Sequence, residues 1–248
     1  MKKLILILSI TFFAACSGGL DTRNMTAENL FHKGKEYFAD DDNLEAQKMF
    51  DLIKLQYPAS QYADDAQFYL AEIDFKREKY ILAAFNYNSL RRIYPSSEYN
   101  KQSLYMRAQC YYKLSPPYER DQEYTLKAIE SFIEFQGTYP NDSLSLEADN
   151  KIKEMREKLA HREFSIAELY KKLDDPKASL VYYDFVINKY DDTQYFEDSY
   201  LGKVESLLKM KRIEEAQNII MLYDKKFPTG NYNQKLKDMY NEVKAIIE

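Results

Sequence analysis

Hydrophobic positions recur at helical spacing from residue 26 onward, and an aromatic residue followed by Pro or Asp interrupts them at intervals. These pairs are Tyr57-Pro58, Tyr94-Pro95, Tyr139-Pro140, Tyr190-Asp191 and Phe227-Pro228. Successive pairs lie 37, 45, 51 and 37 residues apart. Because a tetratricopeptide hairpin takes about 34 residues, this spacing predicts about five helical hairpins, some with insertions.

Within each predicted hairpin, the first helix (helix A) carries a small residue beside larger ones, and the second (helix B) carries a small residue followed by larger apolar ones. Small residues let two helices cross closely, and the larger side chains fill the space beside them. Each hairpin leaves one apolar face open, so neighbouring hairpins must stack. The pattern predicts an all-α, tetratricopeptide-like superhelical solenoid. Its positions are Leu30, Gly34, Tyr37, Ala46, Phe50 and Ile53; Ala71, Ala83, Tyr87 and Leu90; Leu104, Ala108, Tyr111, Ala128, Phe132 and Phe135; Ala167, Tyr170, Ser179, Tyr183 and Val186; and Leu201, Val204, Ala216, Ile220 and Tyr223.

Three segments depart from the simple repeat. Residues 115–122 form an insertion between the two helices of the third hairpin. Residues 143–173 keep helical spacing without a breaker, which predicts one long helix extending helix A of the fourth hairpin. Residues 234–248 predict a capping helix that closes the end of the stack, with Leu236, Met239, Tyr240, Val243 and Ile247 on one face. No linker rich in Pro, Gly or Ser interrupts 26–248, so we expect a single domain there.

The N-terminus has the layout of an export signal. Two lysines precede an apolar stretch at 4–13, and two alanines stand directly before Cys16. The stretch is shorter than the roughly 20 residues of a membrane-spanning helix. A small-small-Cys ending resembles the lipobox of bacterial lipoproteins, so we expect a signal peptide at 1–15, an acylated Cys16 and a flexible tether over 16–25. An ordinary secretory peptide is the alternative.

Charge and composition narrow the partners. The formal charge is −5, with 35 basic and 40 acidic residues. A mildly acidic chain of interspersed charges is a poor ligand for nucleic acid. The two cysteines, Cys16 and Cys110, cannot form a disulfide framework if Cys16 is modified. The chain is therefore expected to bind proteins and, through its anchor, a membrane.

The sequence gives little evidence for a metal site or for catalytic residues. His32 and His161 have no Cys or second His at i+3 or i+4, so we expect solvated histidines, no metal site and no cofactor. The acidic pairs sit at predicted helix ends, where carboxylates cap N-termini. Cys110, between aromatic residues, is expected to be a small core residue rather than a nucleophile. We therefore expect no enzyme.

One helix A face is the better functional candidate. One residue beyond the packing positions, three successive hairpins present aromatics seven residues apart: Phe31 and Phe38 with Lys35 between them, Phe68 and Phe75, and Tyr105 and Tyr112. We predict that these seven residues form a ladder that binds an extended peptide with aromatic side chains. The alternative is that packing between adjacent A helices buries some of these rings.

Longer stretches resemble the BamD family of outer-membrane β-barrel assembly lipoproteins. They are YPASQYADDAQFYLA (57–71), SLYMRAQCYY (103–112), ERDQ (119–122), AIESFIEFQGTYPNDSLSLEADNKI (128–152) and REKLAHREFSIAELY (156–170). The last contains the family's LA-x-x-E-x-x-x-A-x-x-Y pattern at Leu159, Ala160, Glu163, Ala167 and Tyr170.

The resemblance implies a location and partners. The chain would be lipid-anchored in the outer membrane on the periplasmic side. Its C-terminal hairpins would dock on a BamA-like barrel subunit alongside other assembly-complex lipoproteins, and its N-terminal hairpins would recognise C-terminal signals of unfolded outer-membrane proteins.

Other functions are compatible with a helical-repeat fold but involve different partners. A periplasmic tetratricopeptide lipoprotein could serve pilus assembly or cell-envelope coordination, although such repeats tend to be closer to 34 residues without the long helix. A surface glycan-binding lipoprotein would be longer and use Trp platforms, whereas this chain has no Trp. The helical part of a muramidase would need an additional catalytic domain.

Overall fold

The structure is a computed structural model that describes residues 22–247, which form helices joined by short turns and loops. The predicted signal peptide and Cys16 lie outside the described residues. The described part divides into two compact units, 22–66 and 67–247. No helix within 22–247 is both long and apolar enough to cross a bilayer.

The first unit is built on one hairpin, α1 (Ala27–Ala39) and α2 (Asn43–Gln56), and contains the start of α3 (Ala63–Lys76). Side chains cap both hairpin helices. The Thr26 hydroxyl accepts the Asn29 N–H at 3.2 Å, and the Asp42 carboxylate accepts the Glu45 N–H at 3.2 Å. Such caps satisfy backbone donors that the first helical turn leaves unpaired.

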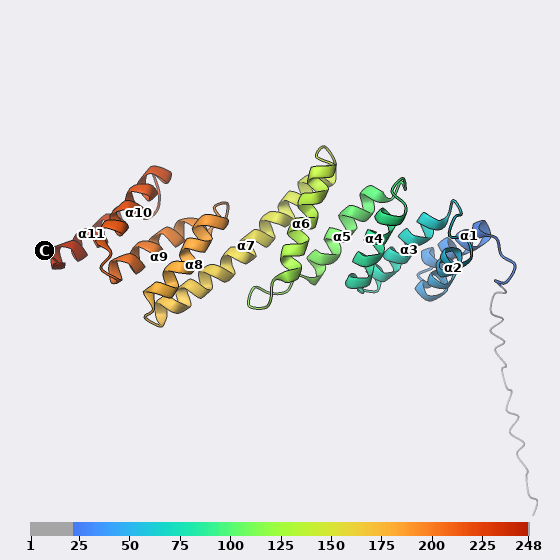
Figure 1. The fold of residues 1–248 in the computed structure, drawn as a ribbon, viewed down its shortest axis with the longest axis horizontal. Coiled ribbons are helices and arrows are strands. Elements are labelled where there is room, and N and C mark those ends of the chain that lie inside the picture. Colours follow the sequence, from blue (N-terminus) through green and yellow to red (C-terminus); the bar gives the residue numbers. More distant parts are fainter. Residues whose placement is uncertain (1–21, 248) are drawn as a thin grey trace, which may run out of the picture. The chain divides into compact units, whose positions relative to one another are not determined.

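The second unit holds the rest of α3 and eight further helices among the residues described (Figure 1). Each helix from α4 onward packs against the next along the chain, and α9 also contacts α7 and α11. The helices are α4 (Tyr80–Ile93), α5 (Asn100–Leu114), α6 (Glu123–Thr138), α7 (Ser143–Lys172), α8 (Pro176–Lys189), α9 (Tyr195–Lys209), α10 (Ile213–Lys226) and α11 (Asn233–Ile247).

Every helix B ends on the aromatic residue of the repeating pair. The C-caps of α2, α4, α6, α8 and α10 are Tyr57, Tyr94, Tyr139, Tyr190 and Phe227. Each donates its N–H to the carbonyl four residues earlier and then leaves helical geometry. Four of the five are followed by Pro, which disfavours a helical conformation in the preceding residue. An aromatic-Pro pair therefore ends helix B in four hairpins, and Tyr190-Asp191 ends it in the fourth hairpin.

The A-to-B turns share one backbone geometry wherever no insertion intervenes. Asp41, Glu78, Asp174 and Lys211 each occupy the left-handed region, with φ of 61°, 58°, 64° and 58°. Each stands in the turn between the paired helices, α1–α2, α3–α4, α7–α8 and α9–α10. Among the five described hairpins, the third replaces this turn with the 115–122 loop. Four of the five hairpins described therefore share one turn geometry.

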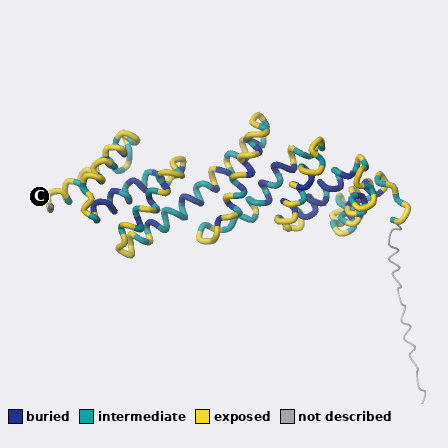
Figure 2. Tube along the Cα trace, in the orientation of Figure 1, coloured by how far each residue is buried: buried dark blue, intermediate teal, exposed yellow. Residues whose placement is uncertain are grey.

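These helices confirm the fold predicted from the sequence. The five hairpins, the insertion after Leu114 and the closing helix α11 are all present, and the long helix α7 spans Ser143–Lys172. Figure 2 shows buried positions recurring along the helices of both units. The largest fully buried side chains include the helix B residues Tyr87, Tyr183 and Tyr223. That 26–248 folds as a single domain stays a prediction.

Candidate protein-binding face

The predicted ladder lies on the A helices, beside their small packing residues. In the second unit, Ala71 and Ala108 are fully buried against their neighbours, as expected for close helix crossings. The next residues along, Glu72 and Gln109, are partly exposed. This places the ladder at the edge of the core, where a side chain can turn either inward or outward.

In the first unit, Phe31 turns inward. Its ring is 8% exposed and stacks on Tyr62, with centroids 5.0 Å apart and planes at 24°. The Lys35 ammonium lies 5.6 Å from the centre of the Phe31 ring, and Lys35 is exposed. Phe38, one turn further on, is partly buried. Phe31 therefore contributes to the hairpin core and offers a ligand only a small part of its surface.

In the second unit the first ring of each pair is also buried. Phe68 is 5% exposed and stacks on Tyr99 at 4.2 Å and 16°. Tyr105 is 6% exposed and meets Phe132 and Phe135 edge-on, at 5.7 and 5.2 Å. These first rings are therefore buried, but the rings that cover them lie outside the A helices, whereas the alternative expected burial between adjacent A helices. Peptide binding by the ladder as a whole stays a prediction.

The tyrosines that cover Phe31 and Phe68 occupy a fixed position in the sequence, which the predicted repeat pattern did not include. Tyr62 and Tyr99 each stand five residues after the aromatic that ends helix B, in YPASQY and YPSSEY. Tyr195 holds the same place after Tyr190 and lies 5.3 Å from Phe164 of α7. In the first, second and fourth hairpins, an aromatic residue five places beyond the helix B terminus thus covers a ring on the preceding helix A.

The second ring of each pair keeps exposed surface. Phe75 is partly exposed and meets Tyr80 edge-on at 5.3 Å. Tyr112 is also partly exposed, and its hydroxyl donates to Glu154 of α7, 2.7 and 2.9 Å from the two carboxylate oxygens. The Lys151 ammonium lies 4.3 Å from the Tyr112 ring centre. Burial and the hydrogen bond to Glu154 raise the pKa of Tyr112 to about 12, so the phenol stays protonated and donating at neutral pH.

Paired Tyr and Glu residues recur behind this face. The Tyr87 hydroxyl donates to Glu72 and the Tyr183 hydroxyl donates to Glu168, and both pairs are 15 residues apart along the chain. Burial raises the pKa of Glu72, against the opposing effect of the Tyr87 hydrogen bond. Burial is also the main cause that raises the pKa of both tyrosines. The pairs tie helix A to helix B in the second and fourth hairpins.

The insertion in the third hairpin is fastened to α7. The Lys158 ammonium donates to the Ser115 hydroxyl and, at 2.9 Å, to the Pro116 carbonyl. The Gln122 side-chain amide donates to the carbonyls of Pro117 and Arg120 at 2.8 and 2.9 Å. Burial lowers the pKa of Lys158. These hydrogen bonds hold the 115–122 loop against the long helix α7.

The two histidines differ in environment. His32 is exposed, 4.0 Å from Glu28. His161 is partly buried, stacked on Tyr195 at 5.1 Å and 6° and lying 4.1 Å from Tyr118 of the insertion. The prediction of a solvated histidine is wrong for His161, because Tyr118 of the 115–122 loop and Tyr195 at the start of α9 pack against its ring.

Cys110 is fully buried, as expected for a core residue. Burial raises the pKa of its thiol above the ordinary value, so the thiolate needed for nucleophilic chemistry is disfavoured. Within the described part of the chain, no group of three or more His, Cys, Asp or Glu side chains is arranged to hold a metal ion.

Comparison with known families shows to which protein family the chain belongs. The family model of YfiO, described as outer membrane lipoprotein, matches residues 23–222. The chain belongs to this family. The match begins before α1 and ends within α10, so it covers all five hairpins at least in part.

Curated relatives share the same extent. The chain is similar to the outer membrane protein assembly factor BamD of Neisseria meningitidis serogroup B, with 22% identity over 80% of this chain and 81% of that protein. It is 22% identical to BamD of Rickettsia prowazekii and 25% identical to BamD of Pasteurella multocida. Both alignments cover 88% of this chain and 87% of the relative.

The chain also matches solved structures of tetratricopeptide repeat proteins. One from Parabacteroides merdae has 15% identity and a TM-score of 0.39, covering 89% of this chain and 73% of that chain. A thermophilic one from Thermus thermophilus has 15% identity and a TM-score of 0.37, covering 88% of this chain and 98% of that chain.

Proposed function

We propose that this family member is a non-catalytic scaffold of outer-membrane β-barrel protein assembly. The observation that carries the proposal is the family match over 23–222, together with relatives named outer membrane protein assembly factor BamD along most of their length. Stacked hairpins suit such a role because they expose extended faces on rigid elements.

The proposed location is the periplasmic side of the outer membrane, with the chain held by acyl groups on Cys16. The family description as outer membrane lipoprotein supports an anchor, and the lipobox-like sequence favours Cys16 as its site. Two or more acyl chains hold a protein at a membrane stably, whereas one chain holds it only reversibly.

The proposed partners fall into two groups. The C-terminal hairpins bind the BamA-type barrel subunit, in the company of other lipoproteins of the complex. The A-helix face of the second and third hairpins binds C-terminal signals of unfolded outer-membrane proteins. Of the predicted ladder, Phe75 and Tyr112 are the rings in the second unit that keep exposed surface for a ligand.

An affinity capture tests the proposal. The tagged, full-length chain is purified from detergent-solubilised envelopes, and its partners are identified by mass spectrometry. We expect a large outer-membrane barrel protein with periplasmic repeat domains among the partners. Consistent recovery of pilus, division or glycan-uptake proteins in its place would overturn the assembly role and leave the fold unaffected.

A further inference from the structure

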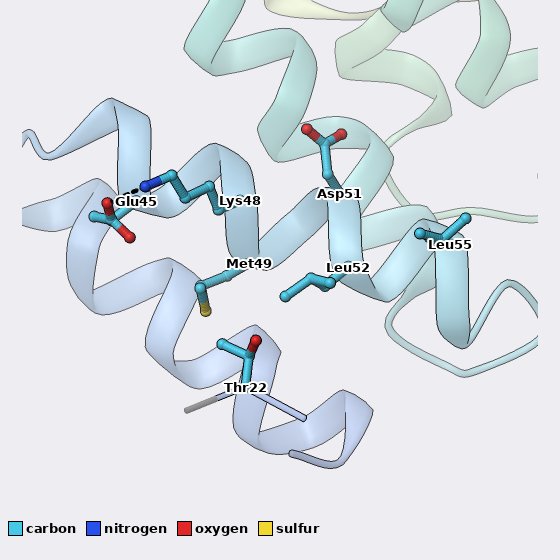
Figure 3. Close-up of a pocket in the computed structure, with 7 residues that line it drawn as sticks. All are labelled: Thr22, Glu45, Lys48, Met49, Asp51, Leu52 and Leu55. Atoms are coloured by element: carbon cyan, nitrogen blue, oxygen red, sulfur yellow. Dashed lines mark hydrogen bonds and ion pairs between the residues drawn. The ribbon is translucent and has the colours of Figure 1, made fainter. Parts of the chain in front are cut away.

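An apolar groove lies on the exposed face of α2 in the first unit (Figure 3). Its volume is about 480 Å³. Met49 is buried at its floor, Leu52 is partly exposed, and Leu55 at its end is 79% exposed. The other lining residues are Thr22, Glu45, Lys48 and Asp51.

The chain that leads to Cys16 starts at this groove. Thr22 lines it, and Figure 3 shows Thr22 facing Met49 and Leu52. The Met25 N–H donates to the Thr22 carbonyl at 3.2 Å, and the Met25 carbonyl accepts the Tyr57 hydroxyl at 2.8 Å. These bonds hold 22–25 as a turn against the end of α2, so the starting point of the tether is fixed in the first unit.

The tether is short. Six residue steps separate Cys16 from Thr22, and such a segment spans at most about 20 Å when fully extended. An acylated cysteine lies at the boundary of lipid and water. If Cys16 carries the anchor, as in the proposed function on which this inference rests, the groove lies within about 20 Å of the membrane surface.

We propose that the α2 face that presents Leu52 and Leu55 rests on the lipid surface beside the anchor. The rim is polar: Lys48 and Glu45 form an ion pair one turn apart, and Asp51 is a second acidic lining residue. An exposed leucine at the end of an apolar groove gains by entering the headgroup region. The contact is weak alone, but the tether keeps the local concentration of lipid high. The anchor and α2 together would fix how the first unit faces the membrane.

The absence of Trp from the sequence makes a direct test available. Leu55→Trp introduces a single indole at the proposed contact. The matched control is Leu146→Trp on α7, where the native leucine is 71% exposed. Both acylated full-length proteins are reconstituted into vesicles of phosphatidylethanolamine and phosphatidylcholine, with or without bromine near the top of an acyl chain. Intact mass establishes acylation of Cys16, and circular dichroism establishes folding.

We expect brominated lipid to lower the emission of Leu55→Trp about twofold, since bromine quenches only indoles at lipid depth, and to leave Leu146→Trp unchanged. An acylated, folded Leu55→Trp protein without quenching would overturn the lipid contact and leave the proposed function intact. Equal quenching of both variants would overturn a contact specific to α2. A protein whose Cys16 lacks acyl groups would overturn the anchor and the contact together.

Discussion

Gly202 of α9 lies directly against the ring of Tyr183 of α8. A Cβ added at Gly202 would have three atoms of that ring within 3.0 Å, a separation that Cβ atoms essentially never show. Tyr183 is fully buried and its hydroxyl donates to Glu168, so the end of the ring that faces Gly202 is held in place. The fourth and fifth hairpins therefore stack at a distance that only glycine allows.

Gly202→Ala is expected to destabilise the protein by about 1–3 kcal/mol, the usual cost of overpacking a well-filled core. The measurement is urea-induced unfolding followed by circular dichroism. Gly137→Ala in α6 is the matched control, because nothing lies within 4 Å of the added Cβ. The control should be neutral or stabilising by up to about 1 kcal/mol, since Ala favours a helix over Gly. Equal effects of both substitutions would show that the Tyr183 contact does not limit the packing.

The ion pair between Arg156 and Asp192 predicts a pH dependence of stability. The Arg156 Nε lies 2.8 and 3.0 Å from the two Asp192 oxygens, and its Nη2 lies 2.6 Å from one of them. These hydrogen bonds hold the pKa of Asp192 below its ordinary value of 3.8. A carboxyl group with a lowered pKa in the folded state stabilises the fold above its unfolded pKa and loses that effect as the pH falls through its folded pKa.

Asp192→Asn should therefore cost about 0.2–1 kcal/mol at pH 7, in the range of exposed pairs with good geometry. The difference from the unsubstituted protein should vanish progressively below a pH of about 3.8. Thermal unfolding across a pH series measures it. A cost that persists undiminished in acid would mean that the side chain acts through packing rather than charge.

The left-handed turn residues predict a stabilising substitution. Lys211 has a φ of 58°, a conformation that costs a residue with a Cβ about 1–2 kcal/mol but costs glycine little. Lys211→Gly should raise the free energy of unfolding by about 0.5 kcal/mol, because the greater freedom of glycine in the unfolded chain offsets part of the gain. Lys225→Gly within α10 should instead lower it by about 0.7 kcal/mol. Chemical denaturation of both variants checks the sign, and a loss at position 211 would contradict the interpretation of the turn.

The A-helix face can be tested with a peptide. The probe is a fluorescent peptide that ends in an aromatic residue, and its binding is followed by anisotropy. Loss of both Phe75 and Tyr112 to Ala should weaken binding about tenfold, if each ring contributes roughly 0.5–1.5 kcal/mol. Phe85→Ala is the control, since Phe85 is 64% exposed on a helix B. Equal weakening by the control, or none by the double variant, would remove peptide binding from this face.

Much of the fold could be predicted from short-range signals. The aromatic-Pro pairs fix where helices B end, and the uninterrupted spacing over 143–173 predicted α7 to within one residue of its observed end. Both signals act within a few turns of one helix, so no tertiary knowledge was required.

The fate of the ladder could not be predicted in the same way. One step along a helix turns a side chain by about 100°, so a residue next to a buried position can point into or out of the core. For Phe31 and Phe68 the outcome depends on Tyr62 and Tyr99, which approach from the link to the next hairpin. For His161 it depends on the inserted loop. These contacts join segments that are distant along the chain, and the repeat pattern does not predict them.

The most direct test of the proposed function is depletion of this protein in its own cells, followed by measurement of folded barrel proteins in the outer membrane. Folded barrels are distinguished from unfolded ones by their altered gel migration after heating. We expect a fall in folded barrels that the unsubstituted protein restores and a Cys16→Ser variant restores poorly. Undiminished barrel assembly after complete depletion would contradict the assembly role.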